Sequence, residues 1–323
     1  MDVFEPARLG PLTLRNRVIK AATFEGMTPG AVVSDELIEY HRRPAAGGVA
    51  MTTVAYCAVA PEGRTERDQI WMRPDAVPGL RRLTDAVHAE GAAAAAQIGH
   101  AGPVADASST GLPAISAGRF FNPLGMRFTK VATAADIERI TRAHAEAARL
   151  AIESGFDAVE IHFGHNYLAS SFLSPRLNKR EDAYGGPVEN RAKVALGIAR
   201  AVRDEVGDRI AITAKLNMRD GVRGGLEIDD SLYVARRLQD EGMAEGGRRG
   251  QGAGPGRRSD VVLRAVPPPG HRGLRGTQLR PRHGPAYPEP RAERVFSHRA
   301  GRVRRRAGRR PPPRPCPQAR PSC

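Results

Sequence analysis

The sequence predicts an α/β fold in which parallel strands alternate with helices, a (β/α)8-type barrel that stops after about five units. Apolar runs of strand length alternate with amphipathic stretches of helix length between residues 18 and 242. Most of these runs are apolar throughout, as in parallel strands that are buried on both faces. Polar side chains gather where the runs end, which is where parallel barrels carry their sites.

The predicted elements follow one another in a regular order. Residues 4–17 alternate apolar and polar side chains around a Gly-Pro turn and predict a hairpin that caps the bottom of the barrel. The predicted strands cover residues 18–23, 47–59, 92–100, 157–162 and 210–217. The predicted helices cover residues 34–41, 75–91, 133–155, 189–206 and 227–242. Ser34 and Thr133 are the expected N-caps of two of them, and Asp136 completes a capping box with Thr133.

Residues 158–168 carry the clearest functional pattern. An apolar run broken only by Glu160 predicts a buried strand, and His162, His165 and Tyr167 follow within six residues. Three protic side chains at the end of a strand are well placed to hydrogen-bond one substrate oxygen. From the pattern alone, two satisfied structural histidines and a half-buried tyrosine remain an alternative.

The same stretch resembles the signature of the Old Yellow Enzyme family of flavin-dependent ene-reductases. The matching residues are His162, His165, Tyr167, Phe172 to Pro175, Asn178, Arg180, Asp182 and Tyr184 to Gly186. Asn166 stands where the family usually has glycine. The resemblance covers residues 3–243 and implies a TIM barrel that holds FMN without a covalent bond at the carboxyl ends of its strands.

The resemblance also implies an activity. NADH or NADPH would reduce FMN, and the reduced flavin would reduce an activated alkene such as an enone or enoate. His162 and His165 would bind the carbonyl oxygen of this small-molecule substrate, and Tyr167 would donate a proton to its α-carbon. These three residues are therefore the expected catalytic residues.

Four further residues are implied in cofactor binding. Gln97 ends a strand, and its amide offers both a donor and an acceptor to the pyrimidine edge of a flavin. Lys215 brings a cation near the end of another strand, although a lysine snorkelling at the barrel mouth is the alternative. Ala22 and Thr23 correspond to the family's loop beside the flavin, but a Thr23 hydroxyl bonded to the backbone fits equally well. Gly99, where relatives often carry an aromatic residue, predicts a wider substrate pocket.

Residues 244–323 form a second region of different composition. They contain 20 arginines, no lysine and 4 acidic residues, a net charge of +16, whereas residues 1–243 have 30 basic and 31 acidic residues. With its proline runs and few large apolar residues, this region predicts a disordered Arg/Pro/Gly-rich tail without a strand. One explanation is binding to nucleic acid or to an acidic surface. The missing lysine, and a break where a sixth strand is due, favour an out-of-frame translation and argue against a nucleic-acid partner.

The missing units bear on the cofactor. TIM-barrel phosphate sites are frequently built after strands seven and eight, for which the sequence shows no pattern. We therefore expect weak FMN binding or none, and open sheet edges. An inactive, truncated or frameshifted relative is accordingly the alternative to an active reductase.

Other classes of protein find little support. Cys57, Cys316 and Cys323 lack the spacing of a metal or redox site, so no metal is expected. The sequence shows neither a leader pattern nor an apolar run of about 18 residues. We therefore expect a cytoplasmic protein without a membrane partner, and the composition leaves an oligomer open.

Overall fold

The computed structural model describes residues 2–122, 126–242 and 263–266, all within one compact unit of residues 1–272. The strands of the main sheet are β3 (Ile19–Lys20), β4 (Met51–Ala58), β5 (Ala93–Gly99), β10 (Ala158–Phe163), β11 (Ala211–Asn217) and β12 (Leu263–Val266). The main helices are α1 (Asp35–Ala46), α2 (Val77–Ala89), α4 (Ala134–Glu153), α7 (Lys193–Val206) and α8 (Ile228–Asp240).

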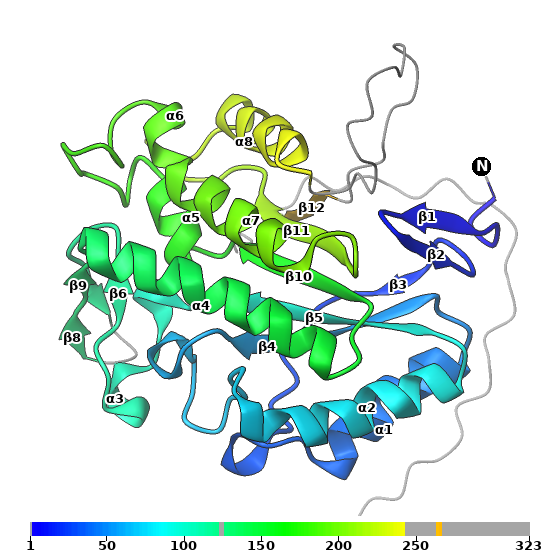
Figure 1. Ribbon diagram of the computed structural model, residues 1–323. Coiled ribbons are helices and arrows are strands. Elements are labelled where there is room, and N and C mark those ends of the chain that lie inside the picture. Colours follow the sequence, from blue (N-terminus) through cyan, green and yellow to red (C-terminus); the bar gives the residue numbers. More distant parts are fainter. Residues whose placement is uncertain (1, 123–125, 243–262, 267–323) are drawn as a thin grey trace, which may run out of the picture. The chain divides into compact units, whose positions relative to one another are not determined.

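The main sheet has its strands in the order β12-β11-β10-β5-β4-β3. Every neighbouring pair is parallel, and the spatial order follows the chain. Figure 1 shows this sheet curling, with the connecting helices on its outer side. Such a strand and helix repeat forms part of the wall of a (β/α)8 barrel, which confirms the predicted fold class. Among the described residues, β3 and β12 are the two edges of the sheet.

The strand β12 corrects one prediction. The sequence analysis expects no strand after residue 243, but Leu263–Val266 pairs in parallel with β11. The strand is only four residues long and lies in an Arg-, Pro- and Gly-rich stretch. The average composition of that stretch therefore does not indicate the short, mainly apolar sequence that forms the strand. The predicted boundary at residue 243 and the rest of the tail lie outside the described residues.

The core lies between the outer face of the sheet and the helices. Leu80, Leu83 and Val87 of α2 are fully buried there, at helical spacing. Local signals fix where helices begin: the Ser34 hydroxyl accepts a hydrogen bond from Leu37 N at 3.1 Å at the start of α1. Thr133 begins α4 with the complete capping box that the sequence predicts.

The predicted N-terminal hairpin is present as β1 (Ala7–Leu9) and β2 (Leu12–Leu14). Leu9 and Leu14 pack in one cluster with Met51, Ala158 and Ala211, which begin or lie near the start of their strands. The hairpin therefore covers the amino ends of the sheet strands (Figure 1), opposite the ends that carry the predicted site.

Two connections contain structure that the sequence analysis does not expect. Between β5 and α4 lie η4 (Gly102–Val104), α3 (Ala107–Thr110) and two small sheets, β6 (Ile115–Ser116) with β9 (Lys130–Val131) and β7 (Phe121–Asn122) with β8 (Arg127–Phe128). The loop predicted after β10 contains a buried helix, α5 (Leu168–Leu173), and the next helix is split into α6 (Val188–Arg191) and α7. Short 3-10 helices also occur, η1 (Pro29–Ala31), η2 (Pro61–Gly63) and η3 (Pro74–Ala76).

Arg180 ties these two connections together. Its guanidinium pairs with Asp182 and donates to the backbone carbonyls of Ala117, at 3.3 Å, and Ala132, at 2.9 Å. The loop after α5 is thereby fastened to the segment between β5 and α4. Since both acceptors are main-chain atoms, the link depends on the path of that segment.

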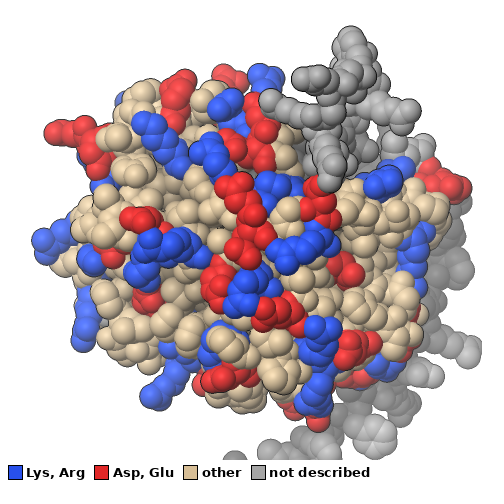
Figure 2. Space-filling view, viewed as in Figure 1, with Lys and Arg blue, Asp and Glu red and all other residues tan. Residues whose placement is uncertain are grey.

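Charged groups are mixed on the surface that Figure 2 shows, where Lys and Arg alternate with Asp and Glu. On α4, for example, Arg149 pairs with Glu146 and Glu153. This mixture agrees with the balanced charge of residues 1–243. In the part of the chain that the structure describes, no helix is long and apolar enough to cross a membrane.

Candidate active site at the carboxyl ends of β5, β10 and β11

Strand alternation brings the predicted residues to the inner face of the sheet. Val159 and Ile161 of β10 belong to the core beneath the helices, so Glu160 and His162 face the other way. Register then extends this face to the neighbouring strands. Gln97 is the Cα partner of Glu160, and Lys215 is the partner of His162.

His162 and His165 form a directed hydrogen-bond pair. Gly164 N donates to His162 Nδ1 at 3.1 Å, so this nitrogen is an acceptor and the ring proton is on Nε2. His162 Nε2 lies 3.1 Å from His165 Nδ1 and donates to it. The proton of His165 is therefore on its Nε2. His165 is exposed, so the pair presents an N–H donor at the mouth of the site.

The backbone of the loop supports this orientation. His165 and Asn166 both have positive φ angles, 56° and 57°. Asparagine tolerates the left-handed region better than most residues, which explains why Asn166 stands where the family usually has glycine. Asn217, at the end of β11, accepts the His165 backbone N–H on Oδ1 at 3.0 Å and thereby fixes the turn.

Both histidines are neutral at physiological pH. Burial lowers the pKa of His162 well below its usual value, and His165 and Lys215 add to the effect. The pKa of His165 is also lowered, first by desolvation and then by Lys215. These shifts agree with the directed pair, because a protonated ring could not accept at Nδ1.

Tyr167 stacks on His162, with ring centroids 4.2 Å apart and an interplanar angle of 21°. It precedes α5 directly, so the start of that helix sets its position. Burial raises the pKa of Tyr167 to about 12. The phenol therefore keeps its proton across the physiological range, as a general acid must before it reacts.

Gln97 is buried and donates from Nε2 to Glu160 Oε1 at 2.6 Å. A carboxylate here orients the amide, which leaves the Gln97 carbonyl oxygen to accept from another group. Lys215 lies close enough to both histidines to lower the pKa of each. The structure therefore brings Gln97 and Lys215 to the same inner face as the histidines.

Ala22 and Thr23, the two residues predicted beside the flavin, differ in burial and in their contacts. Ala22 is buried in a cluster with Tyr56 and the partly buried Tyr167 and so lies beside the site. Thr23 is exposed and donates its hydroxyl to the carbonyl of Ala21 at 3.3 Å. This bond is the backbone alternative that the sequence analysis leaves open for Thr23.

Gly99 packs closely against its neighbours. A Cβ atom placed on it would meet His162 Cβ at 2.9 Å and two ring atoms of Tyr56 at 3.7 Å. The missing side chain makes room for residues that are already there. Its direct effect is close packing between β5 and His162, and the wider pocket that the sequence analysis expects stays a prediction.

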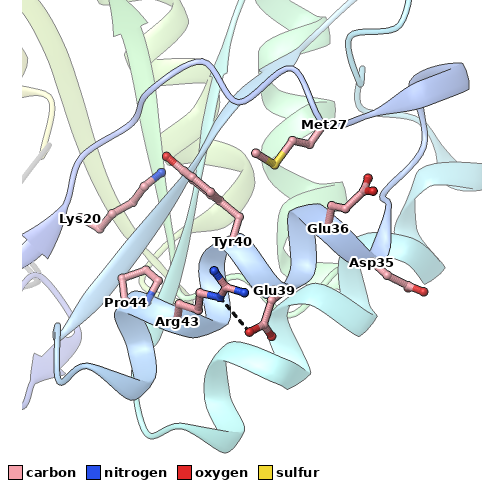
Figure 3. A pocket seen from close by; sticks show the side chains of 8 residues that line it. All are labelled: Lys20, Met27, Asp35, Glu36, Glu39, Tyr40, Arg43 and Pro44. Atoms are coloured by element: carbon pink, nitrogen blue, oxygen red, sulfur yellow. Dashed lines mark hydrogen bonds and ion pairs between the residues drawn. The ribbon is translucent and has the colours of Figure 1, made fainter. Parts of the chain in front are cut away.

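A separate pocket lies on α1, away from these residues (Figure 3). It has a volume of about 790 Å³, and Lys20, Met27, Tyr40 and Pro44 are among its lining residues. Lys20 pairs in register with Thr52, whose hydroxyl bonds His41 of α1, so this pocket opens on the helix side of the sheet. It contains none of the predicted site residues.

Sequence reasoning missed three contributors to the site. Tyr56 contacts the rings of His162 and Tyr167, and Asn217 holds the His165 backbone. Glu160, which orients Gln97, is visible in the sequence as the one charged residue in an apolar strand. For Tyr56 and Asn217, the position near a strand end is the only signal. Among the described residues, no three His, Cys, Asp or Glu side chains are grouped to hold a metal.

A parallel barrel wall with hydrogen-bond donors and an acid at the carboxyl ends of its strands is the architecture of a TIM-barrel enzyme. Residues 2–246 match the model of the NADH:flavin oxidoreductase / NADH oxidase family. The chain belongs to this family, which confirms the resemblance to Old Yellow Enzyme. The cofactors of the family, flavin and NADH or NADPH, are those that the sequence analysis expects.

Individual relatives of the chain are also oxidoreductases. The chain is 55% identical over 241 residues to the 4,4'-dithiodibutanoate disulfide reductase of Rhodococcus erythropolis, covering 75% of this chain and 60% of that protein. It is 32% identical over 250 residues to an NADPH dehydrogenase of Listeria monocytogenes, covering 75% and 71%. It thus spans less than two thirds of the length of the disulfide reductase.

Solved structures show the same fold. A 2-naphthoyl-CoA reductase in complex with 2-naphthoyl-CoA matches with a TM-score of 0.71 at 29% identity, covering 74% of this chain and 39% of that chain. An Old Yellow Enzyme homologue from Zymomonas mobilis matches with a TM-score of 0.68 at 24% identity, covering 76% and 72%.

Proposed function

We propose that the chain is an FMN-dependent NAD(P)H oxidoreductase that reduces the C=C bond of small activated alkenes. The observation that carries this proposal is the pair His162 and His165, which ends in an exposed N–H donor beside the protonated Tyr167. A carbonyl oxygen accepts from such a donor, and the negative charge that develops on it during reduction strengthens the bond.

The residues divide the work. Reduced flavin, when bound, would supply the hydride for the new C–H bond at the β-carbon. His165, oriented by His162, stabilises the oxygen of the developing enolate. Tyr167 forms the second C–H bond by donating its hydroxyl proton to the α-carbon, and the tyrosinate then recovers a proton from water.

The inner face offers a donor set that suits the ring of FMN. The Gln97 amide matches the mixed donors and acceptors of the pyrimidine edge, and Lys215 supplies a cation for a ring that is anionic when reduced. Ala22 lies beside them, whereas the Thr23 hydroxyl is engaged with the backbone. The described part of the main sheet contributes six strands, so a phosphate site after strands seven and eight is not among these residues.

We therefore expect flavin to be held by its ring and only weakly. Added to the purified full chain, FMN and riboflavin should shift the flavin absorption band near about 450 nm with affinities within about threefold of each other. Both should be lost on gel filtration. NADPH oxidation should then depend on added flavin and on an enone such as 2-cyclohexenone.

Two outcomes would change this view. One FMN per chain retained through gel filtration would mean that residues outside the described ones hold the phosphate, and the weak-binding prediction would be wrong. No spectral shift with either flavin, together with no NADPH oxidation, would overturn the proposed function for this chain. The motifs would then record descent from an active relative.

Disulfide reduction is a second candidate, because the relative from Rhodococcus erythropolis is a disulfide reductase at 55% identity. Hydride addition to one sulfur would break the S–S bond and release a thiol and a thiolate. Cys57 is no redox partner for this reaction, since it is buried and burial raises its pKa to about 12. Comparing NADPH oxidation with 2-cyclohexenone and with 4,4'-dithiodibutanoate separates the two candidates.

The pH dependence of enone reduction follows from the shifted groups. The lowered pKa of His162 and His165 keeps both rings neutral below pH 6.5, where an ordinary histidine gains a proton. Burial raises the pKa of Tyr167 to about 12, so the phenol stays protonated well above neutral pH. With saturating flavin, kcat/KM should be constant from about pH 6 to pH 9. A fall of kcat/KM below about pH 6.5 would show that the histidines titrate in their usual range.

A further inference from the structure

We propose that Tyr56 is a specificity-determining residue, a fixed aromatic wall that excludes substrates with bulky substituents beside the carbonyl-binding histidines. This inference rests on the proposed function in one respect, because it assumes that the ligand of the two histidines is a carbonyl compound. It adds a residue from β4, a strand for which the sequence analysis assigns no role in the site.

A bulge in β4 aims the side chain into the site. Val54 pairs with Ala96, and the next pair is Cys57 with Ile98. Between these two pairs β4 advances by three residues and β5 by two, so β4 contains one extra residue. Val54 and Cys57 both pack in the core beneath the helices, and the extra residue turns Tyr56 to the inner side. Bulges beside active sites commonly re-aim a side chain in this way.

The ring of Tyr56 touches both parts of the proposed machinery. Its centroid lies 5.4 Å from that of Tyr167 and 6.3 Å from that of His162. Two of its ring atoms lie 3.7 Å from the position that a Cβ atom on Gly99 would take. This is an ordinary van der Waals distance, so the ring lies directly against β5. Tyr56 thus supplies, from β4, an aromatic surface beside His162 and Tyr167.

Hydrogen bonds hold the wall in place. The Tyr56 hydroxyl donates to the carbonyl of Gly63, which also accepts from Ala101 N at 2.9 Å. Gln69 Nε2 donates to the Tyr56 carbonyl at 3.0 Å. Tyr56 is 4% exposed, and its hydroxyl and its backbone carbonyl are both hydrogen-bonded, so moving the residue for a larger ligand would leave buried polar groups unpaired.

The test compares two ketones that differ in bulk, cyclohexanone and 3,3,5-trimethylcyclohexanone. Binding to the full chain is followed by the NMR signals of the imidazole rings, which needs neither flavin nor turnover. The wild type should bind cyclohexanone at least about tenfold more tightly, the scale on which a pocket discriminates methyl groups. Tyr56→Ala and Tyr56→Leu should bring the two affinities within about threefold.

Two variants serve as controls. Tyr56→Phe keeps the ring and should keep the selectivity. Tyr40→Ala removes an aromatic ring from the pocket on α1 and should also leave the ratio of affinities unchanged.

The proposal is overturned if neither Tyr56→Ala nor Tyr56→Leu narrows the ratio, or if the wild type binds neither ketone. If Tyr56 had a purely structural role, its substitution would weaken the binding of both ketones equally and leave the ratio of their affinities unchanged. That result would also count against the proposal. Failure of the proposed function is read separately, from the flavin band and NADPH oxidation. A selective ketone site without redox activity would leave Tyr56 as the wall and reject only the reductase.

Discussion

Tyr167→Phe should lower kcat for enone reduction by about 100- to 10,000-fold, the contribution that a positioned general acid makes. The phenyl ring can keep the stack on His162, so the loss isolates the hydroxyl. The measurement is NADPH oxidation with 2-cyclohexenone and excess FMN. Reduction of the flavin by NADPH in the absence of enone should stay within about threefold of the wild type.

The disulfide substrate provides a matched control for this variant. A thiolate leaves without a proton from the enzyme, so reduction of 4,4'-dithiodibutanoate should be far less sensitive to Tyr167→Phe. A kcat for the enone within about threefold of the wild type would mean that the proton comes from another donor. The assignment of Tyr167 as general acid would then be withdrawn.

Gly185→Ala is expected to destabilise the fold by about 3 kcal/mol or more. A Cβ atom at Gly185 would lie 1.8 Å from the backbone oxygen of Arg180, far inside contact distance. The two segments cannot separate easily, because Gly185 N donates to Asp182 O at 3.0 Å and Arg180 is fastened to the segment before α4. Urea unfolding of the full chain measures the change.

Two neighbouring alanine variants calibrate this result. Gly186 has a φ of 80° but open space around its Cβ position, so Gly186→Ala should cost only about 1–2 kcal/mol of backbone strain. Gly197 lies inside α7 with nothing within 4 Å, and Gly197→Ala should stabilise by up to about 1 kcal/mol. Equal stability of Gly185→Ala and Gly186→Ala would contradict the argument from close approach.

The order of elements could be predicted because each has a local cause. The capping box of Thr133 and Asp136 starts α4 in the sequence and in the structure alike. The hairpin of residues 4–17 was also visible locally, in alternation and a Gly-Pro turn. By contrast, α5 has no side-chain cap, and β12 is four residues long in a basic stretch. Elements held mainly by tertiary packing leave little trace in the sequence.

The members of the candidate site were predictable only in part, and its geometry was not predictable. His162, His165 and Tyr167 stand close together in the sequence, and a family resemblance assigned their roles. The direction of the histidine pair depends on Gly164 N, and the turn at His165 depends on Asn217 from another strand. The place of Tyr56 depends on a one-residue shift of register between β4 and β5. Such long-range relations cannot be read from spacing.

Arg180 has a consequence for the evolution of the chain. It recognises the segment between β5 and α4 through the carbonyls of Ala117 and Ala132, which every amino acid possesses. Substitutions along that segment can therefore accumulate without loosening its attachment above the site. The rim of the site is free to diversify while the scaffold beneath it stays constant, so new substrate preferences can arise at little cost to folding.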